Sequence, residues 1–272
     1  MCIRDRSGGL FANVRLNRHL AEQSPLDEVF VYPAMGDEGL PVGAALSFLL
    51  ERDGLAHWLA QRRGLDHLYF GRDYDGEIDR VLASDPAIKR IAGAPADTAA
   101  ARLAAGEIGA IYAGRMEYGP RALGGRSILA NPAAPHVHDE LNRRLERSEF
   151  MPFAPCVLEE DCAAVFDITP VNRRAARFMT ITCTVREAWH GRIPAIIHVD
   201  GTARPQIVCD RDNPLYAGIL RGFRAATGIP VLINTSFNVH EEPIVNTPEE
   251  AMRALLDRRV DFLVTNQAVH TL

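Results

Sequence analysis

The densest group of residues able to do chemistry lies in a short stretch rich in glycine and arginine. Residues 114–127 read GRMEYGPRALGGRS and contain three arginines and four glycines. Glycines let a backbone approach a ligand closely, and guanidinium groups bind pairs of anionic oxygens. The stretch is therefore typical of a phosphate-binding loop, with Arg115, Arg121 and Arg126 as candidate ligands. A surface loop whose arginines pair with acidic residues is the alternative interpretation.

Two apolar segments, at 194–199 and 231–234, each run into a group of polar side chains. Polar groups at the end of a strand are where α/β domains place their sites. Amide and hydroxyl groups in such a place can hold a small planar amide or phosphate oxygens. The candidates are His198, Asp200, Thr202 and Arg204 in the first group, and Asn234, Ser236 and Asn238 in the second. A satisfied core histidine and a simple Asx or Ser/Thr turn are the respective alternatives.

A third candidate region joins a charged helix end to an apolar segment fixed by prolines. Residues 142–155 read NRRLERSEFMPFAP. The proline-fixed segment can direct Arg143, Arg144 or Arg147 toward the interior of the domain. By itself, such a charge pattern is more often a solvated helix face.

Two weaker signals lie near the N-terminus. The string GGLFAN at 8–13 can place Asn13 beside a ligand at the start of a helix. The string GDEG at 36–39 puts Asp37 in a tight loop before another helix. One carboxylate completes a metal site only with partners, and the sequence has no histidine pair at i, i+4 spacing to supply them.

Composition limits the classes of function. The chain has 272 residues, 47% of them hydrophobic, and a formal net charge of -5, so it can bury a sizeable core but offers no overall attraction to nucleic acid. Its longest apolar run, at 42–50, is well below the about 20 residues that a membrane-spanning helix needs. The charged N-terminus is unlike a signal peptide, and five cysteines without CxxC spacing do not indicate disulfides or zinc. We expect a cytoplasmic protein without membrane or nucleic-acid partners.

Periodicity and capping residues predict a mixed α/β fold in two unequal parts, the larger beginning near residue 95. Residues 53–94 carry scattered glycines and mixed charges, so we expect an irregular connector there. Asp97 or Thr98 is expected to cap the helix that follows, and Thr247 and Glu250 to form a capping box. Other helices are expected up to about residue 20, at 41–50 and at 248–256. Strands are expected at 29–32, 108–113, 181–185, 195–199, 231–234 and 260–264.

Together these strings resemble the O-carbamoyltransferase family that includes nodulation-factor and aminoglycoside carbamoyltransferases. The motifs GRMEYGPRALGGRSILANP, EFMPFAP, IPAIIHVDGTARPQIV, TGIPVLINTSFN and EEPIVNTPEEA follow the family's order from about residue 95 onward. The earlier strings GGLFANVRLN and VYPAMGDEGLPVGAAL resemble the end of the family's first domain. The resemblance covers the chain past Ser7.

The resemblance implies a division of the chain into three parts. Residues 1–52 would be the C-terminal fragment of an actin-like ATPase domain similar to the tRNA-threonylcarbamoyl transferase, with 1–7 foreign to the family. Residues 53–94 would be a connector. Residues 95–272 would be an activating domain with a fold like that of threonylcarbamoyl-adenylate synthase. Most of the first domain would then lie outside this chain.

The resemblance also implies a reaction in two steps. The activating domain would turn carbamoyl phosphate and ATP, with Mg2+, into carbamoyl-adenylate. The first domain, with iron or another divalent metal, would pass the carbamoyl group to a hydroxyl of a small molecule. Carbamate is a poor acyl donor, so transfer needs a good leaving group and the exclusion of water. The number of subunits is open, with a homodimer as one possibility.

Roles carry over from the family residue by residue. Arg121, Arg126 and Ser236 fall on positions expected to hold phosphate or the carbamoyl group. The HVDGT string, with His198, Asp200, Thr202 and Arg204, would line the same pocket. Asp37 matches the acid of the family's metal site, whose histidine partners would lie upstream, and Asn13 matches a turn on the nucleotide side.

One departure from the family pattern concerns its cationic motif. Many members read K-x-R-E-x-F-R-P-F-A-P, whereas this chain has Leu145, Ser148 and Met151 at three of the charged positions and keeps only Arg147. Arg143 or Arg144 would replace the lost cations, or the chemistry would differ in this subgroup.

Two alternatives to this function stay open. A hydrogenase-maturation carbamoyltransferase would share the chemistry but should carry cysteine-rich zinc motifs and an acylphosphatase-like segment, which this sequence lacks. An RNA-binding module is a different class, because domains related to the activating domain can bind RNA. Its affinity would fall steeply with salt, whereas the enzyme would exchange pyrophosphate into ATP when carbamoyl phosphate is present.

Overall fold

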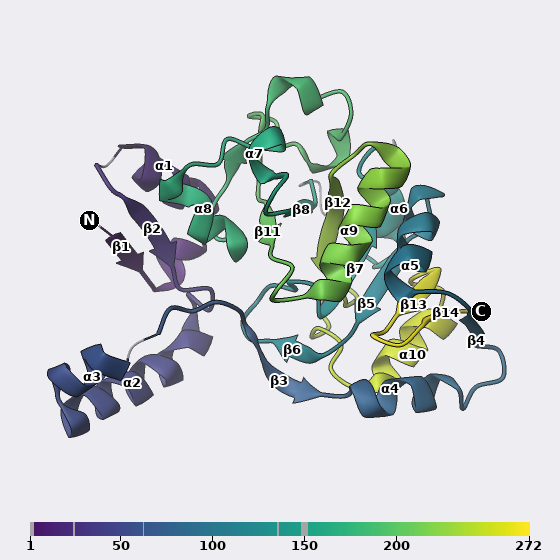
Figure 1. The fold of residues 1–272 in the computed structure, drawn as a ribbon, viewed down its shortest axis with the longest axis horizontal. Helices are drawn as coiled ribbons and strands as arrows, with labels where there is room; N and C mark the ends of the chain where they lie inside the picture. The colour runs from purple at the N-terminus through teal and green to yellow at the C-terminus, as the bar shows by residue number, and fades with distance from the viewer. Residues whose placement is uncertain (1–2, 24, 62, 135, 148–151) are drawn as a thin grey trace.

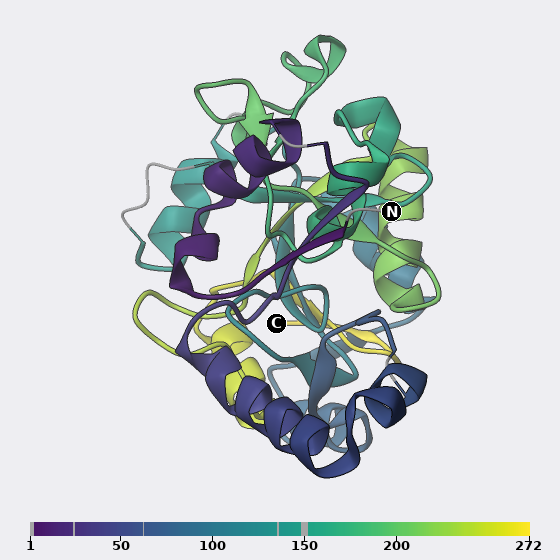
Figure 2. The ribbon, with the colours of Figure 1, turned by 90° about the vertical axis from the view of Figure 1, so that its left-hand side faces the viewer.

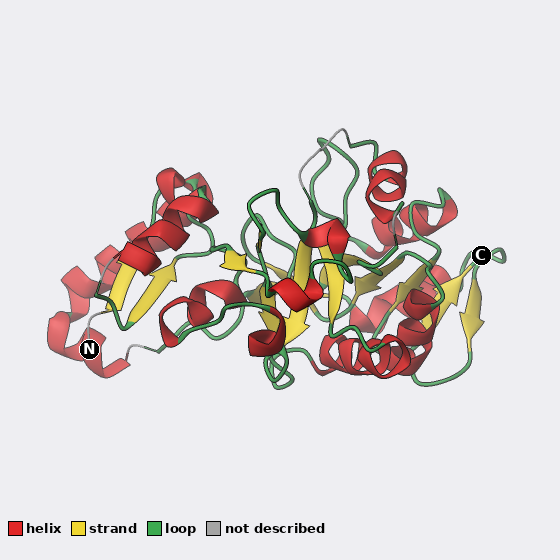
Figure 3. Cartoon of the chain, turned by 90° about the horizontal axis from the view of Figure 1, so that it is seen from above, coloured by secondary structure: helices red, strands yellow, loops and turns green. Residues whose placement is uncertain are grey.

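The structure is a computed structural model that describes residues 3–23, 25–61, 63–134, 136–147 and 152–272. It has a mixed α/β fold, as the sequence predicts, built around one large sheet (Figure 1). The N-terminal strands and helices lie at one end of the molecule and this sheet at the other (Figure 3).

The central sheet has eight strands in the order β11-β8-β12-β7-β5-β13-β14-β4. Two neighbouring pairs, β11 with β8 and β13 with β5, are parallel, and the others are antiparallel. Its middle strands are buried on both faces, which explains their nearly continuous apolar sequences. The bounds are β4 Lys89–Ile91, β5 Gly109–Tyr112, β7 Arg126–Ala130, β8 Ala154–Leu158, β11 Gln206–Val208, β12 Val231–Ser236, β13 Phe262–Val264 and β14 Val269–Thr271.

Helices α5 (Pro95–Ala104) and α9 (Pro214–Thr227) pack against each other beside the sheet. Gly218 and Gly222 of α9 face Ala96 and Ala100 of α5, and a Cβ added at Gly222 would lie 2.7 Å from the Ala100 Cβ. Small residues therefore allow the two backbones to approach closely. Helix α5 begins earlier than predicted, after Ala94, because proline is well suited to the first helical position.

The segment at 53–94 is not irregular, which corrects that expectation. It contains α3 (Leu55–Gln61), β3 (Tyr69–Asp73), α4 (Asp75–Leu82) and the sheet edge strand β4. Helix α4 packs on α10 (Pro248–Leu256) and buries Ile78 and Leu82 completely, so its apolar spacing serves the same core as the later strands. The predicted capping box of α10 is confirmed.

The N-terminal end contains a small parallel pair, β1 (Ile3–Arg6) with β2 (Glu28–Val31), and helix α1 (Val14–Gln23). Helix α8 (Pro170–Arg177) packs against β2, as Figure 1 shows. Buried Asn17 of α1 donates a hydrogen bond of 2.7 Å to the backbone oxygen of Thr180. The N-terminal part is thus joined to the larger part through a buried polar contact.

Helix α2 (Leu40–Asp53) and α3 form a pair along the outer edge of the molecule (Figure 2). Neither has a buried residue, although α2 is largely apolar. Phe48 is 61% exposed and Leu40 is 67% exposed. An exposed apolar helix of this length is unusual for a free surface.

Two predicted strands differ from the structure. The 181–185 segment holds only the short β9 (Cys183–Thr184), which pairs with β10 (Thr202–Ala203). The prediction of a strand at 195–199 is wrong, because residues Pro194–Ile196 form a 3-10 turn that begins with a proline, which cannot donate to a ladder. The other short elements are β6 (Arg115–Glu117), α6 (Val137–Arg144), α7 (Cys162–Val165) and 3-10 turns at Gly9–Ala12, Asp37–Gly39 and Glu187–Trp189. Among the described residues, no helix is both long and apolar enough to cross a membrane.

Candidate functional site

A cationic pocket of about 200 Å³ opens beside the end of β12. It gathers side chains from separate segments that the sequence had singled out one by one. Its lining contains three arginines and a single carboxylate, that of Glu241, so the pocket suits an anionic ligand. The predicted residues that line it are Arg121, Arg147, Arg204, Asn234, Ser236 and Asn238.

Arg147 is held in place by the residues that follow β12. Its Nη1 donates to Thr235 Oγ1 at 2.8 Å, and its Nη2 donates to Asn238 Oδ1 at 2.7 Å and to Ser236 Oγ at 3.2 Å. Ser236 Oγ donates in turn to Asn238 Oδ1. Donors fixed before a ligand arrives cost no reorganisation when it binds. This cluster is therefore a preorganised group of hydroxyls and one guanidinium.

The loop that carries Arg121 is shaped by a buried carboxylate. Glu117 is 7% exposed, and its Oε1 accepts from the backbone N–H groups of Leu123 and Gly125, both at 2.6 Å, and of Arg126 at 3.3 Å. Gly124 lies within this loop at a φ of 111°, a conformation that favours glycine. Three amides converging on one oxygen fix the backbone on which Arg121 stands.

Arg126 lies away from the pocket although the sequence suggested it as a ligand. It is completely buried and donates to the backbone oxygens of Gly125 at 2.8 Å and of Ala113 and Gly114 at 3.2 Å. Its guanidinium carbon lies 3.8 Å from the centroid of the Tyr112 ring. In this structure Arg126 therefore supports the start and end of the glycine-rich stretch rather than lining the cavity.

The HVDGT residues form a compact turn of their own. Thr202 Oγ1 donates to Asp200 Oδ1 at 2.7 Å, so His198 Nδ1, 3.0 Å from the same hydroxyl, must be the donor to it. Burial lowers the pKa of His198, and the Thr202 hydroxyl lowers the pKa of Asp200. Among these residues only Arg204, which follows the turn, lines the pocket.

The remaining predicted residues lie outside the pocket. Arg115 on β6 is exposed and donates to the backbone oxygen of Gly71. Asn13 accepts from the N–H groups of Arg15 and Leu16 and so caps the start of α1. Among the residues that the structure describes, no group of three histidine, cysteine, aspartate or glutamate side chains is placed to hold a metal ion.

Asp37 lies close to the arginine-bearing loop even though it does not line the pocket. Tyr118, at the start of that loop, donates from its hydroxyl to the backbone oxygen of Glu38. Gly119 approaches Pro33 and Ala34, with a Cβ there coming within 3.7 Å of the Pro33 oxygen. The short turn that carries Asp37 is therefore in contact with the segment that carries Arg121.

Of the three positions at which this chain departs from the family's cationic motif, the structure describes only Leu145. Leu145 is buried, at 1% exposed. Arg143 pairs with Glu140, and Arg144 pairs with Glu140 and with Asp261, so both are engaged outside the pocket lining. Ser148 and Met151 lie outside the described residues.

No role is assigned from the sequence alone to three side chains that donate hydrogen bonds to the backbone of the arginine-bearing loop. Gln206, 4% exposed, donates to the backbone oxygen of Leu123 at 2.7 Å, and Tyr69 donates to the same oxygen at 2.8 Å. Asn213 donates to the Gly124 oxygen at 3.2 Å and to the Tyr69 hydroxyl at 3.3 Å. Of these residues, Gln206 could have been suspected from the sequence, because it ends the string HVDGTARPQ just before an apolar segment. A glutamine buried there needs hydrogen-bond partners for its amide.

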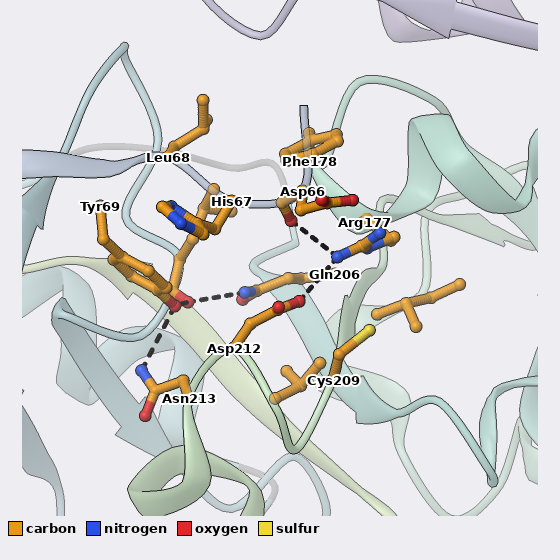
Figure 4. Close-up of a pocket in the computed structure, with 13 residues that line it drawn as sticks. Asp66, His67, Leu68, Tyr69, Arg177, Phe178, Gln206, Cys209, Asp212 and Asn213 are labelled. Atoms are coloured by element: carbon orange, nitrogen blue, oxygen red, sulfur yellow. Dashed lines mark hydrogen bonds and ion pairs between the residues drawn. The ribbon is translucent and has the colours of Figure 1, made fainter. Parts of the chain in front are cut away.

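Figure 4 shows these residues around a second, much smaller cavity of about 30 Å³. Arg177 and Asp212 form an ion pair of 2.6 Å across it. The volume holds about one water molecule. Because its polar groups are largely engaged with one another, this cavity supports the neighbouring loop rather than offering a substrate site.

The fold and the pocket together define a mixed α/β protein with a preorganised pocket lined by three arginines. The chain belongs to the carbamoyltransferase family: the model of the carbamoyltransferase C-terminus matches residues 100–271, and that of the carbamoyltransferase N-terminus matches residues 1–46. These matches confirm the resemblance that the motifs indicated.

Two relatives and one solved structure show the extent of the similarity. The chain is 38% identical to the nodulation protein NolO of Bradyrhizobium diazoefficiens over 95% of this chain and 47% of that protein. It is also 38% identical to a protein of Methanocaldococcus jannaschii over 94% of this chain and 42% of that one, so it spans less than half the length of either relative. Full-length HypF in its phosphate- and nucleotide-bound form aligns over 65% of this chain and 22% of that chain, with a TM-score of 0.45 at 19% identity, a likeness too partial to bear on function.

Proposed function

We propose that this chain carries the activating part of an ATP-dependent O-carbamoyltransferase, and that its arginine pocket binds carbamoyl phosphate. The observation that carries the proposal is the meeting of Arg121, Arg147 and Arg204 beside the hydroxyl of Ser236 and the amides of Asn234 and Asn238. Family membership supports the transfer of a carbamoyl group. The arginines match the phosphate, and the uncharged polar groups match the carbamoyl end.

A larger neighbouring cavity is our candidate for the nucleoside of ATP. It encloses about 320 Å³ and shares Asn238 with the arginine pocket. Phe237, Val239 and Val245 give it apolar walls, and charged side chains such as Arg253 lie among its lining. Ligand sites of this mixed character are typical for small molecules. A nucleoside there would place its phosphates toward the arginines.

The chemistry follows from charge and position. Water would hydrolyse carbamoyl phosphate to carbamate and inorganic phosphate. A carbamate oxygen would then attack the α-phosphorus of ATP, forming a P–O bond as pyrophosphate leaves, to give carbamoyl-adenylate. Mg2+ bound with ATP would neutralise part of the charge of its phosphates. The residues of this chain would hold the reacting groups in line and stabilise the growing negative charge. No side-chain nucleophile is required.

The two-domain description is also a proposal. We propose that residues 95–272 form an activating domain like threonylcarbamoyl-adenylate synthase, and that residues 1–52 belong to an actin-like transferase domain. Transfer to a small-molecule hydroxyl would need the metal of that domain. Asp37 has too few partners among the described residues to hold a metal by itself, so no step is assigned to it here.

Pyrophosphate exchange tests the proposal directly. The 272-residue chain should exchange labelled pyrophosphate into ATP only when carbamoyl phosphate is present. Exchange that is independent of carbamoyl phosphate, or its absence in a folded protein that binds ATP, would overturn the proposed activity. Omitting Mg2+ from a matched assay should abolish exchange, because the metal would neutralise part of the charge of the ATP phosphates.

A further inference from the structure

Asn234 occupies an unusual position in the wall of the arginine pocket. It lies on β12 and is only 1% exposed, yet it is part of the pocket lining. Its Nδ2 donates to the backbone oxygen of Ala122 at 3.0 Å and to Gln206 Oε1 at 2.7 Å. Both N–H groups of the amide are therefore used by the protein.

The orientation of this amide is fixed by two backbone carbonyls. The Leu123 oxygen accepts from Gln206 at 2.7 Å, and a carbonyl can only accept, so Gln206 must turn Nε2 toward it. Its Oε1 then faces Asn234 and also accepts from the Tyr216 hydroxyl at 3.3 Å. Asn234 must present nitrogen to Gln206 and, independently, to the Ala122 oxygen. A flipped Asn234 would place oxygen against oxygen at both positions.

This orientation leaves the side-chain oxygen of Asn234 without a hydrogen-bond donor among the described residues. Asn234 Oδ1 is buried and has no hydrogen-bond partner within the described part of the chain. A buried acceptor left unsatisfied is costly, and such groups in native proteins commonly mark a site that a ligand or water completes. Here the acceptor belongs to a residue that lines a cationic pocket.

We propose that Asn234 Oδ1 accepts a hydrogen bond from the amino group of the carbamoyl moiety, and that Gln206 is the positioning residue that keeps this oxygen available. The proposal rests on the function proposed above and adds the basis of its specificity. Acetyl phosphate has the same shape as carbamoyl phosphate but carries a methyl group where the carbamoyl has NH2. The methyl group would leave Asn234 Oδ1 unsatisfied, so the pocket should select the carbamoyl ligand.

Binding of the two phosphates to the 272-residue chain tests this selectivity. Calorimetry should show carbamoyl phosphate binding roughly tenfold to a hundredfold more tightly than acetyl phosphate, the scale set by one unpaired buried polar group. Asn234→Leu, similar in size but without an acceptor, should bring the ratio of the two affinities close to one. Inorganic phosphate should bind this variant about as well as it binds the wild type, because the arginines remain.

Gln206→Leu should also lower the selectivity ratio, because Asn234 then loses one of the two acceptors that fix the orientation of its amide. The ratio of the two affinities distinguishes a positioning role of Gln206 from a general structural one. Loss of a general structural role would weaken the binding of both ligands by the same factor. Thr235→Val is the matched control, since it alters the same wall without touching the acceptor and should change both affinities by the same factor.

The outcomes separate the two proposals. A wild-type chain that binds phosphate but neither acyl phosphate would overturn the proposed function. A wild-type chain that binds both acyl phosphates equally, or an Asn234→Leu variant that keeps the preference, would overturn the role of Asn234 while leaving the phosphate site in place. Should Gln206→Leu fail to fold, the Asn234→Leu comparison still decides the question.

Discussion

Arg147 donates a hydrogen bond of 2.7 Å to Asn238 Oδ1, joining two segments that are 91 residues apart. Asn238 is itself fixed, because its Nδ2 donates to the backbone oxygens of Val239 at 2.9 Å and of Glu242 at 2.8 Å. The amide oxygen of Asn238 therefore has to face the guanidinium. This hydrogen bond fixes the position of Arg147, which is the one charged residue of the family's cationic motif that this chain keeps.

Arg147→Ala should weaken phosphate binding far more than it weakens the fold. A charge-assisted hydrogen bond is worth about 1.5–3 kcal/mol, so the affinity for carbamoyl phosphate should fall roughly tenfold to a hundredfold. Calorimetry measures this loss. Arg143→Ala is the matched control, because the Arg143 side chain is 71% exposed and exposed pairs contribute little. Equal losses in both variants would place the phosphate elsewhere.

Glu117→Gln should destabilise the protein by about 1.5–3 kcal/mol, since the carboxylate accepts from three backbone amides at once. Urea unfolding measures the change. The affinity for inorganic phosphate should also fall, because Arg121 stands on the loop that these bonds shape. A variant with unchanged stability and unchanged phosphate affinity would show that the loop holds its shape without the carboxylate.

Hydrogen exchange should divide the N-terminal part of the chain into two classes. Amides of β2 should be protected, because Val29 and Val31 are buried and α8 packs over the strand. Amides of α2 and α3 should exchange quickly in this chain, since neither helix buries a residue. Slow exchange throughout α2 would mean that another surface, such as a second copy, covers it in solution.

Stability should depend on the ionisation of Glu140 in acid. Hydrogen bonds from Arg143 and then Arg144 lower the pKa of this carboxyl from 4.5 to about 2. The contribution of ionised Glu140 to the free energy of unfolding is thus complete above about pH 4.5 and is lost as the pH falls toward 2. Because the Glu140 side chain is 33% exposed, we expect at most about 1 kcal/mol. The free energies of unfolding of wild type and Glu140→Gln should converge across this interval, and a constant difference down to pH 2 would contradict the assignment.

Much of the local structure could be predicted from residue types alone. The capping box at Thr247 and Glu250 rests on contacts between near neighbours in sequence. The strands β5 and β12 pair with distant strands, but their apolar residues mark them in the sequence before those partners are known. The segment at 53–94 could not be predicted in this way. Its short β4 has little pattern of its own and becomes a strand because it pairs with β14, far along the chain.

The sequence by itself determined the family, the mixed α/β fold and the candidate residues, because these depend on residue type, order and spacing. Only the tertiary structure decided which candidates meet. It brought Arg121, Arg147 and Arg204 to one pocket, while the buried side chain of Arg126 turned to backbone carbonyls and His198 turned to Thr202. The physical reason is that a sequence motif rich in arginine specifies where positive charges stand along the chain but not which way each side chain points. The direction of each side chain comes from buried partners such as Glu117, which shapes the loop of Arg121, and Gln206, whose hydrogen bond to Leu123 joins segments 83 residues apart. The bond of Gln206 forms only when distant parts of the chain have come together.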